Sequence, residues 1–229
     1  MSLTEQREGI EAGRLGIFAD GVFAFILTLL LIGGDKISDS TDKLLTMLGG
    51  VPAFAVCFFQ NAFFWHGHVR WRKRCHSADS IGRWLSLLLL VFFAMIFVYP
   101  LHMVYSSVFN SLSGGRLPSD FHMTGGPTDM RTLFACFGFA YACMAGTLTL
   151  LFPHAAKSAA KRGFGNLDAG REMRIWSVPA VIGLTLALTA LLLPLSAPSW
   201  AWSIPGFMYS LLSLIGPVVN RFNRRYVHA

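Results

Sequence analysis

Long apolar segments with almost no charged residues are the feature that most constrains how this chain can fold. Six of them follow one another, at about 16–33, 45–66, 84–109, 132–153, 175–194 and 200–220. A helix of roughly 20 apolar residues crosses a bilayer. Charged residues make up only 14% of the chain, against roughly a quarter in soluble domains. The sequence therefore predicts an all-α, polytopic membrane protein whose residues 1–229 form a single domain of six transmembrane helices.

The lysines and arginines are distributed unequally between the two sides of these spans. If the N-terminus is cytoplasmic, fifteen fall on the cytoplasmic side and four on the other. Cytoplasmic loops carry the basic excess, so both termini are predicted to be cytoplasmic. Topology then explains the net charge of +7, and no nucleic-acid partner is expected. The N-terminal segment lacks the basic head and cleavage site of a signal peptide.

Six tryptophans lie near the predicted ends of the spans. They are Trp65, Trp71, Trp84 and Trp176 on the cytoplasmic side, and Trp200 and Trp202 on the other. Tryptophan favours the membrane–water interface, which predicts an aromatic belt at each surface. The basic runs 70–74 and 221–226 also suit anionic lipid headgroups on the cytoplasmic side. Membrane lipids are therefore expected partners.

Histidines and cysteines would supply a metal site or an active site. The cysteines are Cys57, Cys75, Cys136 and Cys143. Three lie in apolar runs, which predicts packing residues rather than disulfides or metal ligands. His66 and His68 are two residues apart, so they point in different directions on a helix. No cluster of carboxylates accompanies the histidines, and we expect no metal, no cofactor and no enzymatic activity.

Small residues recur every four positions in the fourth span, at Gly138, Ala142 and Gly146. Such a ridge lets another helix approach closely. The pattern leaves open whether that helix belongs to the same chain or to another subunit.

A carboxylate stands at the head of the first apolar segment. Asp20 precedes twelve uncharged residues, and Arg14 lies six residues before it. A charge within a span is costly unless it is paired or faces water, and a spacing of six does not place two side chains on one helix face. Two interpretations stay open. Asp20 finds its partner on another helix, where His66 and His68 lie at similar depth, or it caps the helix or snorkels to the interface.

The rest of the first segment carries a stripe of large apolar residues. Phe25, Leu29 and Ile32 follow the i, i+4, i+7 spacing of one helix face, and Thr28 lies beside that face. In a helix that is apolar all round, such a stripe usually marks packing or lipid contact. The pattern alone does not predict a pore.

Residues 14–24, RLGIFADGVFA, resemble the R-x-x-x-F-S-D-G-V-F-A signature of the transmembrane protein 175 family of potassium channels, in its bacterial branch. The continuation FILTLLLI at 25–32 resembles the Ile-x-x-Thr-Leu pattern of that family. The stretch FWHGHVR at 64–70 is similar to its tryptophan-then-histidine-arginine pattern. The motif-level resemblance covers roughly residues 14–109.

The resemblance implies a homotetramer around a central pore that prefers K⁺ as the permeant ion. The first helix of each subunit would line this pore, in a multi-pass protein of the bacterial inner membrane. Rings of large apolar side chains would constrict it, and by position these are Phe25, Leu29 and Ile32. Thr28 would contribute hydroxyls near the axis.

The resemblance also implies a structural network at the cytoplasmic ends of the first two spans. Its members would be Arg14, Phe18, Asp20, Trp65 and His68. Asp20 would then be a structural partner that holds the pore helix in register, rather than an ion ligand.

Three positions depart from the family pattern. Ala19 replaces a serine, Val69 stands where a second histidine is often found, and Phe25 replaces an isoleucine at the first constriction. Because apolar constrictions gate by expelling water, a ring of phenylalanines is expected to narrow or dewet the pore.

Two other functions stay open beside the channel, namely a secondary transporter and a non-conducting membrane protein of the same fold. A transporter binds its substrate near the membrane midplane, at polar groups of broken helices. The polar residues available there are few, namely Thr28, Gln60, Asn61, Thr185 and Thr189. None is strongly ionisable, which disfavours a proton-coupled carrier.

Overall fold

The structure is a computed structural model, and it describes residues 3–32, 40–74, 80–97, 100–119, 126–161 and 169–198, with Ala201, Ile204 and Met208. Seven helices form within these ranges: α1 (Leu3–Ile32), α2 (Thr41–Gly49), α3 (Val51–Arg74), α4 (Ser80–Phe97), α5 (Pro100–Leu112), α6 (Pro127–Lys161) and α7 (Ala169–Leu192). The predicted all-α class is confirmed for this part of the chain. The sixth predicted span, 200–220, lies almost entirely outside it.

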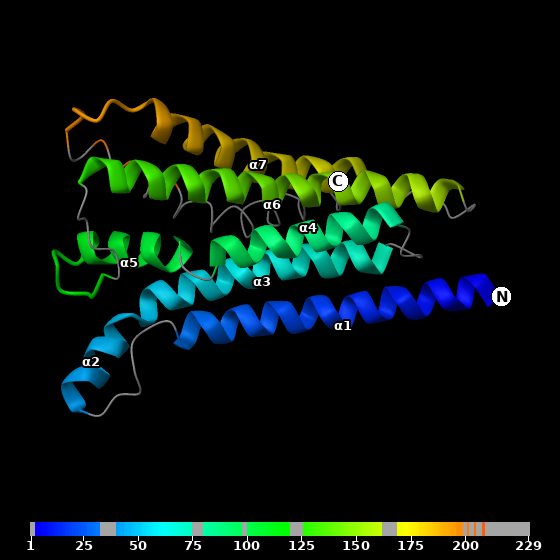
Figure 1. Cartoon of the computed structure of the whole chain (residues 1–229), viewed down its shortest axis with the longest axis horizontal. Coiled ribbons are helices and arrows are strands. Elements are labelled where there is room, and N and C mark those ends of the chain that lie inside the picture. The colour runs from blue at the N-terminus through cyan, green and yellow to red at the C-terminus, as the bar shows by residue number, and fades with distance from the viewer. Residues whose placement is uncertain are drawn as a thin grey trace, which may run out of the picture.

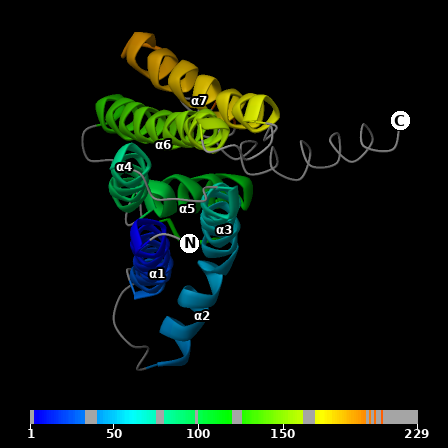
Figure 2. The same ribbon diagram turned by 90° about the vertical axis from the view of Figure 1, so that its right-hand side faces the viewer.

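Most helices run along the long axis of the molecule (Figure 1). Viewed down that axis, α6 and α7 form one side, α4 and α5 the middle, and α1 and α3 the other side (Figure 2). The most extensive packing joins α6 to α7, followed by α4 to α6. The short helix α2 projects from the bundle at one end (Figures 1 and 2). α1 thus lies at the edge of the bundle rather than at its centre.

Two predicted spans are each divided into two helices, which corrects the expectation of one continuous helix. The second is divided between α2 and α3 at Gly49 and Gly50, where the amide of Gly50 donates to the carbonyl of Met47 at 3.0 Å. Two adjacent glycines disfavour a helix. Pro52 has no amide hydrogen, and this is tolerated in the first turn of a helix, so α3 starts beside it.

The third predicted span, 84–109, is divided between α4 and α5. α4 ends at Phe97, and α5 begins with Pro100. Proline is favoured at the first helical position but disfavours helical geometry in the residue before it. Pro100 therefore starts a new helix, and α5 packs chiefly against α3.

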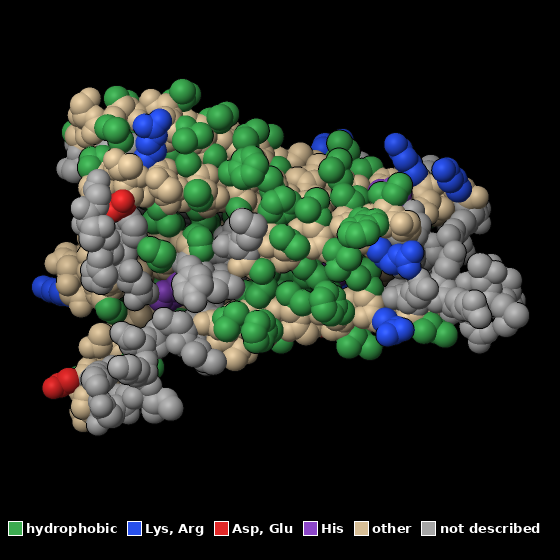
Figure 3. Space-filling model, in the orientation of Figure 1, with side chains coloured by type: hydrophobic (Ala, Val, Ile, Leu, Met, Phe, Trp, Pro, Cys, Tyr) green, Lys and Arg blue, Asp and Glu red, His purple; other side chains and the backbone are tan. Residues whose placement is uncertain are grey.

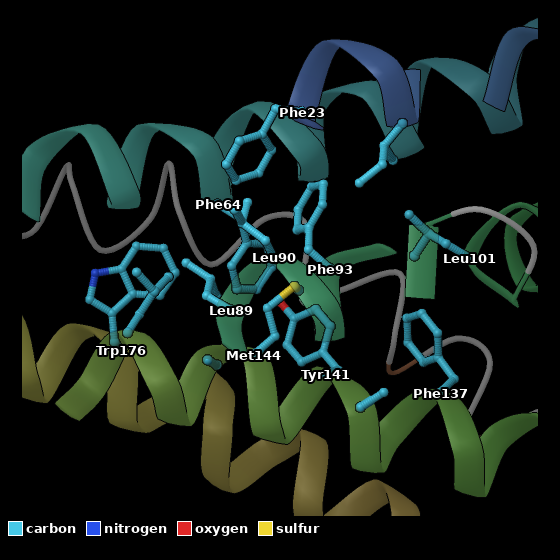
Figure 4. Close-up of a cluster of buried hydrophobic side chains, with 14 of the residues drawn as sticks. Phe23, Phe64, Leu89, Leu90, Phe93, Leu101, Phe137, Tyr141, Met144 and Trp176 are labelled. Atoms are coloured by element: carbon cyan, nitrogen blue, oxygen red, sulfur yellow. The ribbon is translucent and has the colours of Figure 1, made fainter. Parts of the chain in front are cut away.

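The core lies between the α6–α7 side and the α1–α3 side and is rich in aromatic rings (Figure 4). Phe93 of α4 meets Phe23 of α1 edge to face, with ring centroids 4.4 Å apart. Phe64 of α3 meets Tyr141 of α6 at 5.3 Å. Such pairs add about 0.5–1.5 kcal/mol each to the free energy of area burial. One buried face of α1 is anchored in this core through Phe23.

The small-residue ridge of α6 serves a contact within the chain. A Cβ atom on Gly183 of α7 would lie 3.0 Å from the backbone nitrogen of Ala142 and 3.2 Å from the carbonyl oxygen of Gly138. The backbones of α6 and α7 therefore pack closely together at this point, with little room for a side chain at residue 183. At Gly146, by contrast, an added Cβ atom would have no neighbouring atom within 4 Å among the described residues.

The basic side chains gather at the end of the molecule that holds the ends of α3 and α6 and the starts of α4 and α7 (Figure 3). We call it the basic end. Two of the four tryptophans expected in an interfacial belt here are instead core residues, because Trp71 and Trp176 are each 2% exposed. Trp84 is 71% exposed and fits the belt.

Within the described residues, two helices are long and apolar enough to cross a membrane, Pro127–Lys161 and Glu172–Leu192. Ser80–Ala94 is a shorter apolar helix. Polar and basic residues lower the hydropathy of α3, which carries Gln60, Asn61 and four basic residues in its last turns.

Candidate functional site

One face of α1 is uncovered in the single chain. Ile17 is 75% exposed, Phe18 55% and Phe25 62%. Gly21 and Thr28 are exposed as well. Gly21 follows Phe18 by three positions and Ile17 by four, and Phe25 and Thr28 continue this spacing, so the five residues lie on one side of the helix. We call them the open face of α1.

The opposite side of α1 is buried against α3 and α4. Ala19 is fully buried, Phe23 is 3% exposed and Ile26 is 1% exposed. Large apolar residues thus occur on both sides of the helix, but only one side has partners within the described part of the chain. An uncovered apolar face of this kind marks a contact with lipid, with another subunit or with a pore.

The side chain of Thr28 is exposed, and the hydrogen of its hydroxyl group already takes part in a hydrogen bond. Its hydroxyl donates to the carbonyl of Ala24 at 3.0 Å. The hydroxyl oxygen keeps lone pairs that can accept from water or bind a cation.

The other two predicted constriction residues are placed differently. Leu29 is half-buried, at the edge of the open face. Ile32 is the last residue of α1, and its side chain lies outside the described part of the structure.

Asp20 finds its partners on α3. Its Oδ1 accepts a hydrogen bond from Nε1 of Trp65 at 2.9 Å, and its Oδ2 lies 3.2 Å from an Nη atom of Arg72. The Asp20 side chain is 44% exposed and that of Arg72 is 26% exposed. Of the two interpretations of this carboxylate, the structure favours the interhelical one. The pairing joins the basic ends of α1 and α3.

Gly16 makes room for this ion pair. It is buried, and the guanidinium of Arg72 occupies the position that a Cβ atom at residue 16 would need. Arg72 thus crosses the surface of α1 at Gly16 to reach Asp20, one turn further on.

A matched pair of glycines tests this arrangement. Gly13 lies three residues earlier on α1, and an added Cβ atom there would have no described atom within 4 Å. We expect Gly13→Ala to raise the free energy of unfolding by up to about 1 kcal/mol through helix propensity. Gly16→Ala is expected to raise it less or not at all, because the added Cβ atom displaces the flexible guanidinium of Arg72 and weakens its pairing with Asp20. Thermal unfolding of the purified protein in detergent measures both, and equal stabilisation would contradict the packing of Arg72 on Gly16.

The other predicted network residues lie elsewhere. His68 is fully buried, and its Nε2 is 2.7 Å from the hydroxyl of Ser86, so it joins α3 to α4 rather than to Asp20. Phe18 is on the open face. Arg14 is exposed and makes no hydrogen bond or ion pair with the described side chains. The structure therefore brings together Asp20 and Trp65, but neither Arg14 nor Phe18 with them.

Sequence reasoning missed three residues of this site, namely Gly16, Arg72 and Ser86. Arg72 belongs to the run RWRKR, whose composition by itself suggests a topology signal and a lipid contact. A usable signal was present, since Arg72 follows Trp65 by seven residues and therefore shares its helix face. No group of three or more potential metal ligands occurs among the described residues.

Comparisons with known proteins bear on the family and the fold of the chain. A family model described as "Endosomal/lysosomal potassium channel TMEM175" matches residues 14–96. A crystal structure of a variant of the potassium channel MtTMEM175, in complex with a nanobody–MBP fusion protein, is similar in fold with a TM-score of 0.73. The two chains are 20% identical, and the similarity covers 93% of each. No curated protein matches the chain.

The family match spans α1 to α4, which contain the open face, the Asp20 pairing and the His68–Ser86 contact. The shared fold extends over nearly the whole chain. Residues 14–96 thus match the model of the TMEM175 potassium-channel family, and the chain as a whole shares the fold of the potassium channel MtTMEM175.

Proposed function

We propose that four copies of this chain assemble around a central pore that prefers K⁺, with the open face of α1 lining it. The exposure of this face carries the proposal. Phe25 is 62% exposed and Thr28 is exposed, while Ala19, Phe23 and Ile26 on the opposite side are buried. A pore helix needs such a division, because one side must pack on its own subunit and the other must face the axis.

The constriction in this proposal consists of apolar rings at Phe25, Leu29 and Ile32. Apolar rings hold back ions by excluding water, and Phe25 has the largest side chain of the three. The free lone pairs of the Thr28 hydroxyl lie about one turn from Phe25 and offer a polar ring next to the apolar one. The chain would thus conduct slowly unless the Phe25 ring moves or is replaced.

The membrane orientation in this proposal follows the charge. The basic end is placed in the cytoplasm of a bacterial cell, at the inner membrane, because basic residues concentrate on that side. The Asp20–Arg72 pair then lies at the cytoplasmic end of the pore helix.

Shortening Phe25 is expected to raise K⁺ flux. In liposomes that contain the purified protein, we expect a gradient of K⁺ to drive more flux than the same gradient of Na⁺. Phe25→Ala and Phe25→Ile are expected to increase K⁺ flux about tenfold or less. A tenfold increase corresponds to a decrease of about 1.4 kcal/mol in the free-energy barrier to ion passage. The reason is that a smaller ring admits water more readily.

Phe139→Ala is the matched control, because Phe139 is 57% exposed but lies on α6 rather than on α1. It is expected to leave flux unchanged. Saturable exchange without single-channel events would instead indicate a secondary transporter. Absence of flux from folded, assembled wild type and Phe25 variants would indicate a non-conducting member of the family.

A further inference from the structure

The basic end of α3 presents two opposite faces to two different helices. Trp65 and Arg72 contact Asp20 of α1. Gly67 and Arg70 contact α7 instead. With 3.6 residues per turn, these two pairs of residues lie about 180° apart around α3. At this level α3 therefore stands between α1 on one side and the start of α7 on the other.

The contact with α7 is a tight aromatic fit. The indole ring of Trp176 occupies the position that a Cβ atom on Gly67 would need. The same ring lies 4.8 Å from the ring of Phe63 and 5.5 Å from that of Phe64, by centroids. Figure 4 shows Trp176 beside Phe64 in the buried layer. Trp176 is 2% exposed, so its ring is enclosed by neighbouring residues.

An ion pair closes the same contact. Arg70 of α3 donates to a carboxylate oxygen of Glu172, whose side chain is 1% exposed. Glu172 precedes Trp176 by four residues and so lies on the same face of α7. A carboxylate is costly to bury unless it is paired with good geometry, and Arg70, whose side chain is 35% exposed, supplies this pairing. We call Glu172, Trp176, Gly67 and Arg70 the α7 clamp.

The α7 clamp is separate from the other contacts of α7, which packs chiefly against α6. The start of α7 therefore reaches the α1–α3 pair through this clamp. On the other face of the same two turns, α3 holds α1 by Asp20. The end of α3 therefore contacts both α1 and α7 within two turns.

We propose that Glu172 and Trp176 are positioning residues for the pore helix and act on it through α3. They hold the end of α3 against α7, so that Trp65 and Arg72 stay within reach of Asp20. Displacement of α7 at the basic end would then alter the pore. This inference rests on the proposed pore role of α1.

Removing the charge of Glu172 tests the clamp. Glu172→Gln is expected to lower K⁺ flux in liposomes about fivefold, since one charge-assisted hydrogen bond is weakened. The exchanged variant Arg70→Glu with Glu172→Arg restores the pair in reverse and is expected to recover flux at least in part. Arg174→Gln is the matched control, because Arg174 is exposed on the same turn of α7. It is expected to conduct as the wild type does.

A double-mutant cycle separates positioning from general stability. If the clamp acts through α3, Glu172→Gln combined with Arg72→Gln should lower flux little more than Arg72→Gln alone, because both changes release the same contact. If the two substitutions acted independently, the factors by which each lowers K⁺ flux would multiply. Multiplied losses in the double variant would overturn the proposal.

Hydrogen exchange gives a readout that does not depend on conduction. Glu172→Gln is expected to increase the exchange rate of backbone amides at residues 14–20 of α1 as well as at the start of α7. Faster exchange confined to α7 would overturn the positioning role even if the protein conducts. Absence of flux from the wild type, with faster exchange in α1 of the variant, would instead count against the pore and leave the clamp supported.

Discussion

Asp20→Ala is expected to reduce K⁺ flux about tenfold or more and to lower the yield of assembled protein. The substitution removes the acceptor for both Trp65 and Arg72. Each hydrogen bond to a charged group contributes about 1.5–3 kcal/mol, toward the low end where the pair is partly exposed. A loss of about 1.4 kcal/mol corresponds to about tenfold in an equilibrium constant. The basic end of α1 would separate from α3, and the open face would lose its alignment. Size-exclusion chromatography and liposome flux measure the two effects.

Two variants show whether the pairing or the charge matters. Asp20→Asn keeps an acceptor for Trp65 but loses the ion pair with Arg72, and it should give an intermediate loss. Asp42→Ala removes an exposed carboxylate on α2 and should have no effect. Normal assembly and flux from Asp20→Ala would show that the interhelical pairing is dispensable.

Gly67→Ala is expected to produce the largest loss of stability from a single methyl group. The added Cβ atom overlaps the Trp176 ring. Alanine gains about 1 kcal/mol in helix propensity over glycine, so the overlap must exceed this gain to destabilise the protein. We expect it to do so, with a net loss of about 1–2 kcal/mol, because Trp176 is enclosed by its neighbours. The thermal unfolding midpoint in detergent should fall accordingly.

A second-site change tests the cause. Trp176→Phe replaces the indole by a smaller ring and should recover part of the stability in the Gly67→Ala background. Gly146→Ala is the control, because no described atom lies within 4 Å of the Cβ atom that it adds. It should be neutral or stabilising. An equal gain from Gly67→Ala and Gly146→Ala would be incompatible with the close packing of Trp176 on α3.

The sequence predicted the helical class, the family and, in part, the interhelical partners of Asp20. The motif around residues 14–24 indicated a resemblance to the TMEM175 family, and the model of that family matches residues 14–96. Trp65 was expected near Asp20 and lies there. His68 was expected there too, but its ring turns toward Ser86. Three residues separate Trp65 from His68, which shifts their side chains by about 60° around the helix, enough to reach different neighbours.

The helix boundaries were harder to predict, because hydropathy does not show where the chain bends between two successive apolar helices. The apolar residues of 84–109 continue past Tyr99 without a polar break, so the hydropathy pattern showed one span. Pro100 carried the signal for the start of α5. The tryptophans gave a similar error, since a position near a span end suits both an interfacial ring and a core ring such as Trp176.

The sequence by itself determined that the chain is helical, that its basic residues concentrate in alternate connections between the apolar segments, and that its first helix carries the family motif. These properties depend on composition, on spacing along one helix and on local residue order. Only the tertiary structure decided that Arg72 reaches Asp20 over Gly16, and that Arg70, two residues away, turns to Glu172 of α7. The helical period specifies which residues share a face, but the packing of distant segments decides which helix covers that face.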